Sequence, residues 1–339
     1  MKRILIVAIL LIVVILLIPA AMVSMNGSAQ EEKGPFKIAP LEKTSQSSEP
    51  KVQSEVTVPE LEIDVYRSQK EEVESIPLTD YVIGVVASEM PVEYELEALK
   101  AQSLAAQTYV MAQLRLDEES RNVPEEALVT DTVNHQVFLN KEELKEKWGD
   151  AFEENWSKVE EAVLATAGQV IVYNEQPITA AFFSTSNGFT ENSEDYWAQE
   201  IPYLKSVESP WDHESPRFEE EKAIPVQEFE QKLGVTLAGD GSIGEIQART
   251  KGGRVERVQI GDKQFTGRDI REKLDLDSSD FSWFMNGNQI LIQTKGWGHG
   301  VGMSQFGANG MAKEGKTYKE IIEHYYFDVT IEMMKEMEE

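Results

Sequence analysis

The chain has 339 residues, of which 60 are acidic and 32 basic, so its formal charge is −28. Such a charge repels phosphate backbones, which excludes nucleic acid as a partner. The 41% of hydrophobic residues allows a globular core, and the absence of cysteine excludes disulfides, thiolate zinc sites and cysteine nucleophiles.

An apolar segment lies close to the start of the chain, directly after a basic pair. It runs from Ile4 to Val23 with one interruption at Pro19. This length fits a membrane-spanning helix of ~20 residues better than the ~7–15 apolar residues of a signal peptide. A signal peptide cleaved within residues 24–29 is the alternative. We predict a cytoplasmic tip and transmembrane anchor in residues 1–26, with the rest of the chain exported.

Residues 27–57 are rich in Gln, Glu, Lys, Ser and Pro and contain few large apolar residues. A segment of this composition buries too little surface to offset its ordering entropy, so we predict a disordered linker. The pattern becomes globular at Val58. Residues 58–339 are expected to form one large α+β domain with an inserted subdomain.

The first elements of this domain are a strand from Leu61 to Tyr66 and a helix that begins at Thr79. The helix must end near Glu89, because Pro91 disfavours the helical conformation of the residue before it. Further elements are helices at 95–116 and 156–167, a hairpin of 170–173 with 178–183, a hairpin of 243–250 with 254–260, a strand at 290–294, and a helix at 318–325 capped by Thr317. Strands and helices mix without βαβ alternation, which indicates the α+β class.

Three polar clusters could carry chemistry. Glu89 lies at a helix end forced by a proline, where its side chain need not pack. In the following helix Lys100, Ser103 and Gln107 are spaced by three and four residues, so they share one side. This row could line a groove for a hydroxylated ligand, or it could be an ordinary outer face.

The second cluster is the string FSTSNGFT, which includes Ser184 and Ser186. Its hydroxyls could bind sugar or could satisfy the backbone of their own turn. The third is KGWGHGVGMSQFG, with His299 and Gln305, whose glycines allow close approach of the backbone. His299 could act as a general acid or base or could only bind within its loop. The four histidines include no pair at metal-ligand spacing, so we predict no metal and no cofactor.

Together these strings resemble the stage II sporulation protein D family. The resemblance rests on VVASEMP at 85–91, EALKAQ at 97–102, STS at 184–186, IPYLKS at 201–206 and GWGHGVGMSQ at 296–305. It implies a lytic transglycosylase that cleaves peptidoglycan glycan strands already stripped of their stem peptides, during septal thinning and engulfment in endospore formation. It also implies a single-pass protein of the cell membrane at the sporulation septum, with stage II sporulation proteins P and M as partners.

The resemblance also assigns residues. Glu89 falls on the family's catalytic acid, and Lys100, Ser103, Tyr203 and Lys205 fall on positions expected to line the glycan groove. Two departures stand out: Gln107 replaces a frequent arginine, and Asn187 replaces a glycine. Some members have a zinc site that uses cysteine, which this chain lacks, and His135 alone could not hold zinc.

The expected mechanism needs one carboxyl group. Protonated Glu89 would donate to the glycosidic oxygen, and the C6 hydroxyl of N-acetylmuramic acid would then close a 1,6-anhydro ring. Partial burial and the neighbouring Glu93, Glu95 and Glu97 would raise the pKa of Glu89, and Lys100 or Lys205 would bind the lactyl carboxylate.

Two alternatives remain open. A non-catalytic module would bind glycan and recruit or enhance a cell-wall amidase. A hydrolase of the lysozyme type would require a second acid such as Asp131, Asp195 or Asp212.

Overall fold

The computed structural model describes residues 61–116, 123–124, 127–197 and 199–334. Contacts divide the chain into Met1–Glu55 and Val56–Glu339, and all described residues belong to the second unit. The predicted anchor at 1–26 and linker at 27–57 lie outside the described residues. Within the described part, no helix combines the length and apolarity needed to cross a membrane.

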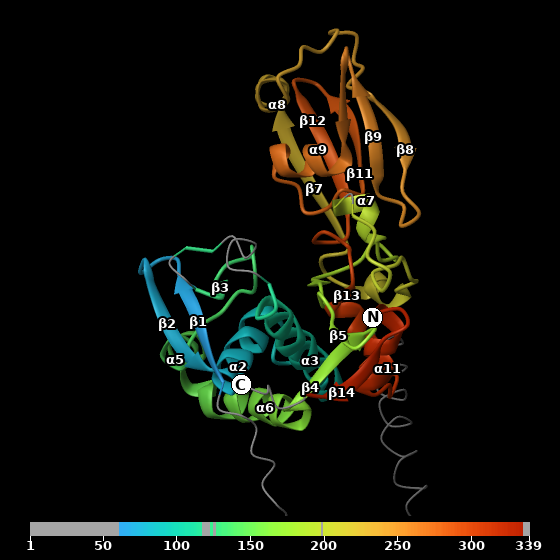
Figure 1. Cartoon of the computed structure of the whole chain (residues 1–339). Helices are drawn as coiled ribbons and strands as arrows, with labels where there is room; N and C mark the ends of the chain where they lie inside the picture. The colour runs from blue at the N-terminus through green and yellow to red at the C-terminus, as the bar shows by residue number, and fades with distance from the viewer. Residues whose placement is uncertain (1–60, 117–122, 125–126, 198, 335–339) are drawn as a thin grey trace, which may run out of the picture. The chain divides into compact units, whose positions relative to one another are not determined.

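The described part mixes helices and strands, as expected for the α+β class (Figure 1). The helices are α2 (Leu78–Glu89), α3 (Leu96–Gln113), α5 (Lys141–Trp148), η1 (Gly149–Ala151), α6 (Phe152–Thr166), α7 (Ser193–Trp197), η2 (Pro210–Glu214), α8 (Val226–Leu233), α9 (Gly267–Leu274), α10 (Gln305–Lys313) and α11 (Tyr318–Tyr325). The strands are β1 (Glu62–Arg67), β2 (Glu72–Pro77), β3 (Val129–Thr130), β4 (Gln169–Tyr173), β5 (Gln176–Pro177), β6 (Phe182–Phe183), β7 (Glu219–Pro225), β8 (Glu245–Arg249), β9 (Val255–Ile260), β10 (Lys263–Thr266), β11 (Phe281–Asn286), β12 (Gln289–Lys295), β13 (Met303–Ser304) and β14 (Thr330–Met333).

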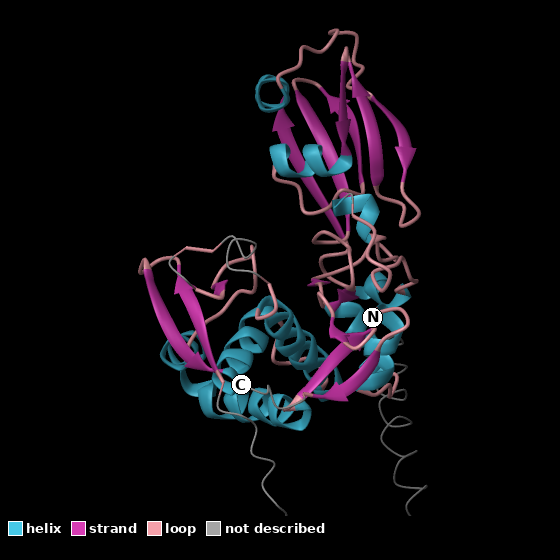
Figure 2. Ribbon diagram, viewed as in Figure 1, coloured by secondary structure: helices cyan, strands magenta, loops and turns pink. Residues whose placement is uncertain are grey.

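The main core is built around helices α2, α3 and α6, which pack on one another (Figure 2). Small residues such as Ala101 and Ala105 let these helices approach closely, while Leu99 and Leu104 fill the space between them. Three small sheets border this core, with strand orders β2-β1-β3, β14-β4-β5 and β13-β6. Residues from both ends of the described chain therefore meet in one core.

A second hydrophobic core lies between the two stretches of sequence that form the first. It gathers apolar residues from Ile224 to Ile292, carried by two antiparallel sheets of order β11-β12-β7 and β10-β9-β8. Figure 1 shows helix α9 lying across these strands. Its buried residues Ile270 and Leu274 belong to this second core, which leaves the polar residues of the helix for other contacts.

Polar contacts join the two cores. The amide of Asn187 donates to the carbonyl of Gly252 (2.9 Å) and to Asp280 (2.8 Å), and the carboxylate of Glu191 accepts from Thr250 (2.7 Å). Asn187 does not use the left-handed conformation, whereas Gly188 has a positive φ of 103°. The amide side chain at this position therefore links the two cores.

Most of the predicted elements are confirmed. Helix α2 ends at Glu89, followed by extended Met90, and Thr317 caps α11 by accepting from the Glu320 amide. Two details differ. Helix α2 begins at Leu78 after Pro77, so Thr79 is not its cap. The strand opposite β4 is only Gln176–Pro177, because Phe182–Phe183 pairs with β13 instead.

Candidate active site

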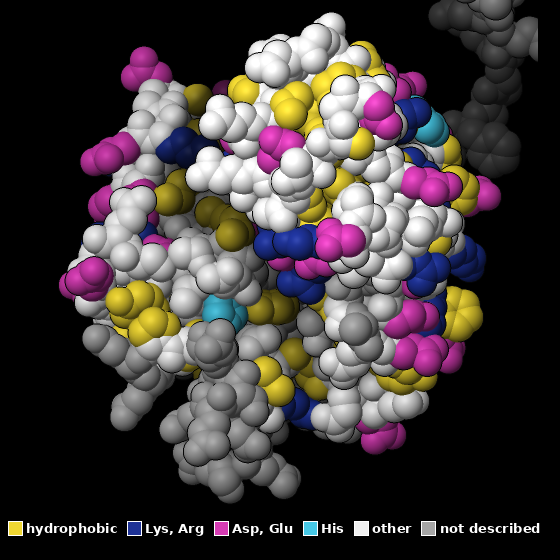
Figure 3. All heavy atoms as spheres, turned by 90° about the horizontal axis from the view of Figure 1, so that it is seen from above, with side chains coloured by type: hydrophobic (Ala, Val, Ile, Leu, Met, Phe, Trp, Pro, Cys, Tyr) yellow, Lys and Arg dark blue, Asp and Glu magenta, His cyan; other side chains and the backbone are white. Residues whose placement is uncertain are grey.

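A groove with a volume of about 1260 Å³ lies among residues of both cores. Figure 3 shows the molecule hollowed near the middle of the view, with Lys and Arg side chains at the margin of the hollow. The lining includes Glu89, Tyr94, Tyr109, His135, Gln136, Lys147, Thr179, Phe183, Ser184, Tyr196, Trp197, Arg217, Arg268, Arg271, Glu272, Trp297, His299, Gln305 and Phe306. Aromatic rings with a few polar groups are typical of ligand sites.

Glu89 enters this groove from the last residue of α2. Met90 is extended (φ −124°, ψ 137°) because the following Pro91 disfavours helix, and the chain leaves the helix axis there. Oε1 of Glu89 accepts a hydrogen bond of 2.7 Å from the amide of Val137. Among the described residues Oε2 has no hydrogen-bond partner, so one carboxyl oxygen is fixed and the other is available to a ligand.

The segment that carries Val137 packs directly on α2. A Cβ at Gly84 would lie 2.3 Å from the Phe138 ring and 2.4 Å from the carbonyl oxygen of Leu139, so glycine is required at this close approach. The Phe138 ring stacks on Tyr81, with ring centroids 5.4 Å apart. The Tyr81 hydroxyl donates to the side chain of Gln136 at 2.9 Å. These contacts set the position of the Val137 amide.

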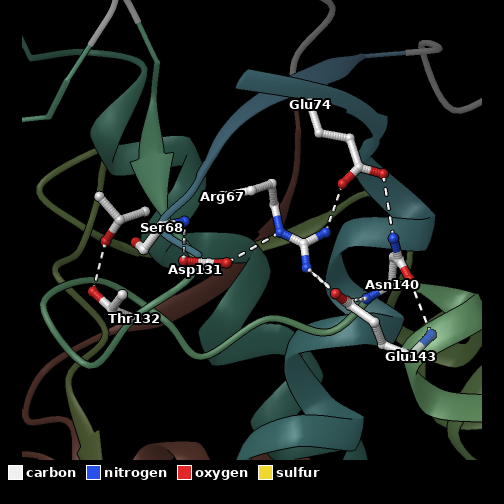
Figure 4. A network of polar contacts seen from close by, with 8 residues as sticks. Arg67, Ser68, Glu74, Asp131, Thr132, Asn140 and Glu143 are labelled. Atoms are coloured by element: carbon white, nitrogen blue, oxygen red, sulfur yellow. Dashed lines mark hydrogen bonds and ion pairs between the residues drawn. The ribbon is translucent and has the colours of Figure 1, made fainter. Parts of the chain in front are cut away.

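A buried arginine holds the other end of this segment (Figure 4). The guanidinium of Arg67, 3% exposed, binds Asp131 (3.1 Å), Glu74 (2.6 Å) and Glu143 (2.6 Å). Asp131 also accepts from the Ser68 amide at 3.0 Å. Burial alone would raise the pKa of Asp131, but these hydrogen bonds outweigh it and lower the pKa. The network keeps the carboxylates charged and ties the segment after β3 to β1.

Burial raises the pKa of the Glu89 carboxyl, while the hydrogen bond from the Val137 amide opposes the shift. The neighbouring acids are not the cause, in contrast to the expectation from sequence. Glu97 accepts from Lys100 and from the Tyr318 amide. A carboxyl whose protonated form is favoured by desolvation can serve as a general acid closer to neutral pH.

The glycine-rich string contributes Trp297, Gly298 and His299 to the lining of the groove. Glycines 296, 298, 300 and 302 all have positive φ, between 79° and 113°. A Cβ at Gly302 would lie 2.1 Å from the Ala181 carbonyl oxygen, and one at Gly300 would lie 2.4 Å from the Arg254 guanidinium carbon. The string therefore wraps closely around its neighbours, as its glycines predict.

His299 lines the groove within a cluster of aromatic rings. Its ring packs against Phe183, Tyr196 and Trp197, with centroids 5.4–5.8 Å apart, and Nδ1 accepts from the Val301 amide at 3.0 Å. Burial, together with the positive charges of nearby arginines, lowers its pKa to about 3. His299 is therefore neutral at physiological pH and shapes the aromatic wall.

The polar row on α3 lies elsewhere than expected. Ser103 is fully buried and shares a hydrogen bond of 2.9 Å with Thr166 of α6, and the Gln107 amide donates to the Gln169 carbonyl. Lys100 is paired with Glu97 at 2.7 Å. None of the three lines the groove: Ser103 faces α6, Gln107 faces β4, and Lys100 pairs with an acid of its own helix.

The remaining candidates divide into two groups. Ser184 and Gln305 line the groove. Ser186 does not, since its amide and hydroxyl are both used by the buried carboxylate of Asp212. Tyr203 and Lys205 also lie outside the lining. The Tyr203 hydroxyl accepts from the Thr179 amide at 2.9 Å, and Lys205 is paired with Glu194 and Glu200.

The acids suggested for a hydrolase do not lie in the groove. Asp131 binds Arg67, Asp195 accepts from Asn192 at 2.8 Å, and Asp212 is buried beneath serines. Among the described residues that line the groove, the carboxylates are Glu89 and Glu272, and Glu272 is paired with Arg268 at 2.6 Å. No group of three or more potential metal ligands occurs in the described part of the chain.

Sequence reasoning missed the cations of the groove. Lys147, Arg217, Arg268 and Arg271 come from α5, the loop after η2, and α9. Arg217 lies over the Trp297 ring at 4.6 Å, and Arg268 over the Tyr196 ring at 4.9 Å. The only available signal was the pair Arg268 and Arg271 on one side of a short capped helix, in a chain with few basic residues.

Comparison with known proteins gives consistent similarities. Residues 66–173 match a family described as Stage II sporulation protein. The chain is 50% identical to Stage II sporulation protein D of Bacillus subtilis (strain 168) over 287 residues, 84% of this chain and 83% of the relative. It is 50% identical to the protein of that name from Bacillus amyloliquefaciens over 90% of this chain and 87% of the relative. It is 28% identical to the Amidase enhancer of Bacillus subtilis (strain 168), over 73% of this chain and 40% of that protein.

Proposed function

Since this chain belongs to the stage II sporulation protein D family, we propose that it is a lytic transglycosylase that cleaves peptidoglycan glycan strands stripped of stem peptides. The observation that carries the proposal is Glu89: a carboxyl group with a raised pKa, one oxygen fixed by Val137 and the other facing an aromatic and cationic groove.

The proposed reaction uses Glu89 twice. The protonated carboxyl donates its proton to the glycosidic oxygen that leaves C1 of N-acetylmuramic acid, and the C1–oxygen bond breaks. The resulting carboxylate accepts the proton of the C6 hydroxyl of the same sugar, whose oxygen bonds to C1. The products are a 1,6-anhydro end and a new terminal hydroxyl, and Glu89 is protonated again. Because the nucleophile is part of the substrate, no second carboxylate has to position a water.

The groove cations support an anionic glycan as ligand. Lys147 and Arg217 form no ion pair within the described part of the chain, and both line the groove. Lys100 and Lys205, the cations expected from sequence, are neutralised by adjacent acids. Positive charge gathered at one groove of a protein with net charge −28 favours binding of carboxylates there over the rest of the surface.

The cellular setting is proposed with the activity. Residues 1–26 would anchor the chain in the cell membrane, residues 27–57 would serve as the linker, and residues 58–339 would act outside the cytoplasm at the sporulation septum. The family resemblance suggests stage II sporulation proteins P and M as partners.

A second candidate function is a non-catalytic module that binds glycan and enhances an amidase. The similarity to an Amidase enhancer favours it. In that case the groove would bind strands without cleaving them, and Glu89 would only form hydrogen bonds.

Product chemistry distinguishes these functions. The purified full-length chain is incubated with peptide-free glycan strands, and the products are analysed by mass spectrometry beside Glu89→Gln. We expect 1,6-anhydro ends, lighter by one water than hydrolytic ends, from the wild type and none from Glu89→Gln. Glu228→Gln, on the surface of α8, serves as the matched control and should cleave normally. Reducing ends would indicate a hydrolase, and intact strands that remain bound would favour the amidase-enhancing module.

A further inference from the structure

Arg271 is held in the groove by neutral groups alone. Its Nη1 donates to the Tyr196 hydroxyl at 2.9 Å, and its Nε donates to the Leu276 carbonyl at 3.3 Å. Among the described residues it has no ion-pair partner, and its Nη2 has no hydrogen-bond partner. Arg271 is half-buried, and its charge reaches Asp277 only at a separation longer than an ion pair, so an external carboxylate would supply the close anionic partner that the described residues do not.

The neighbouring Arg268 shows the contrast. It lies one turn earlier on α9, is paired with Glu272 at 2.6 Å, and stacks on the Tyr196 ring at 4.9 Å. Glu272 is therefore occupied by Arg268. Tyr196 is held from two sides, by the ring contact with Arg268 and by the hydrogen bond from Arg271. These contacts fix the Arg271 guanidinium through Nη1 and Nε, and Nη2 remains without a partner among the described residues.

We propose that Arg271, oriented by Tyr196, is the subsite that binds a carboxylate of the glycan. A guanidinium presents parallel N–H donors that match the two oxygens of a carboxylate. The inference rests on the proposed function, because it takes a glycan strand as the occupant of the groove. In such a strand the lactyl group of N-acetylmuramic acid is a free carboxylate only after its stem peptide has been removed. Where the peptide is attached, the same carbon is part of a neutral amide.

The subsite therefore gives a physical basis for selecting stripped strands. A free lactyl group would form a charged, bidentate pair with Arg271. An amide at this place would bring one acceptor, no charge and a bulky substituent. The enzyme that supplies the substrate must accordingly hydrolyse the amide between the lactyl group and the peptide.

Binding is measured in the Glu89→Gln background, so that no strand is cleaved. Peptide-free glycan tetrasaccharides with free lactyl carboxylates are compared with the same tetrasaccharides converted to methylamides. Calorimetry gives the affinity, and the fluorescence of Trp197 and Trp297, which line the groove, gives an independent signal. We expect amidation to weaken binding about 10- to 100-fold, as for loss of a charged hydrogen bond, and Arg271→Gln to weaken binding of the free carboxylate by a similar factor.

The proposal is decided by comparing the effect of Arg271→Gln on the two ligands. Arg271→Gln should have little effect on the methylamide, because the interaction is already absent. Tyr196→Phe should weaken binding of the free carboxylate by a smaller factor, and Arg271→Lys should retain part of it. Arg257→Gln removes the same charge from an exposed position on β9 outside the groove, and should leave both affinities unchanged.

Two outcomes would overturn the subsite: equal losses for both ligands with Arg271→Gln, or no loss for either. Thermal unfolding of each variant separates a folding defect from a binding defect. The proposed function is tested separately in the protein that retains Glu89. If that protein produces no 1,6-anhydro ends, the proposed function fails. Carboxylate-dependent binding without cleavage would retain the subsite and reject the transglycosylase.

Discussion

The protonation of Glu89 depends on its surroundings more than on its own chain neighbours. Burial at the end of α2 disfavours the charged carboxylate and raises its pKa above the usual value of 4.5, and the Val137 amide only partly compensates. A general acid is active in its protonated form. The same burial that makes Glu89 useful therefore lowers the stability of the folded protein once the group ionises.

The sign of this effect gives a prediction. Because the folded pKa exceeds the unfolded pKa, the stabilising contribution of protonated Glu89 is complete below the unfolded pKa and is lost as the pH rises through the folded pKa. We expect Glu89→Gln to match the wild type near pH 4 and to be more stable at pH 8. Urea unfolding at both pH values measures the difference. Equal stability at pH 8 would contradict the burial of the ionised group. Cleavage by the wild type should decline over the same rise in pH.

At the scale of elements, the site depends on the packing of one segment against one helix. The segment from Asp131 to Asn140 is tied to β1 by Arg67 and packs on α2 at Gly84. This segment forms no helix or strand, so its position is set by these contacts rather than by a ladder of backbone hydrogen bonds to a neighbouring strand. Any change that moves it also moves the Val137 amide and releases the carboxyl of Glu89.

Gly84→Ala tests this dependence. Its Cβ would overlap the Phe138 ring and the Leu139 carbonyl, so we expect a loss of about 1–3 kcal/mol in unfolding free energy, as for other overpacked cores. The cleavage rate should fall as well, because the Val137 amide shifts. Chemical denaturation and product analysis provide the two measurements. In a double-mutant cycle, Phe138→Leu should offset part of the loss, whereas strict additivity would show that the clash is absent.

At the scale of the whole molecule, the two cores share one buried cation. Arg254 of the loop before β9 is 1% exposed, donates to the Phe189 carbonyl at 3.1 Å, and lies against Gly300 of the glycine-rich string. Burial lowers the pKa of its guanidinium, and the negative charges of Glu191, Asp280 and Asp212 only partly oppose this shift. The cation thus compensates acids from both cores and supports the wall that carries His299.

Arg254→Leu should therefore be strongly destabilising. Removing one partner from a buried set of charges costs about 3–5 kcal/mol, because the remaining carboxylates lose their compensation. We also expect weaker glycan binding, since residues of both cores line the groove. Arg257 lies on β9 and is exposed, so Arg257→Leu should change the unfolding free energy by no more than about 0.5 kcal/mol. Chemical denaturation of both variants measures their unfolding free energies. Similar losses for the two variants would refute a central role for Arg254.

The sequence by itself determined the features that depend on local chemistry. Pro91 ends α2 and so places Glu89, Thr317 caps α11, and the glycines of the 296–302 string adopt the positive φ that only glycine adopts easily. The sequence motifs that indicate the family also belong here, since they depend on residue order alone.

Only the tertiary structure decided which polar side chains face the groove. The spacing of Lys100, Ser103 and Gln107 places them on one side of α3, but periodicity does not say what they contact. In the structure, Ser103 contacts α6 and Gln107 contacts β4. Conversely, Arg217 and Arg271 reach the groove from positions more than 120 residues away from Glu89 in the sequence. Burial and charge compensation depend on contacts between distant segments, and those contacts exist only once the two cores have formed.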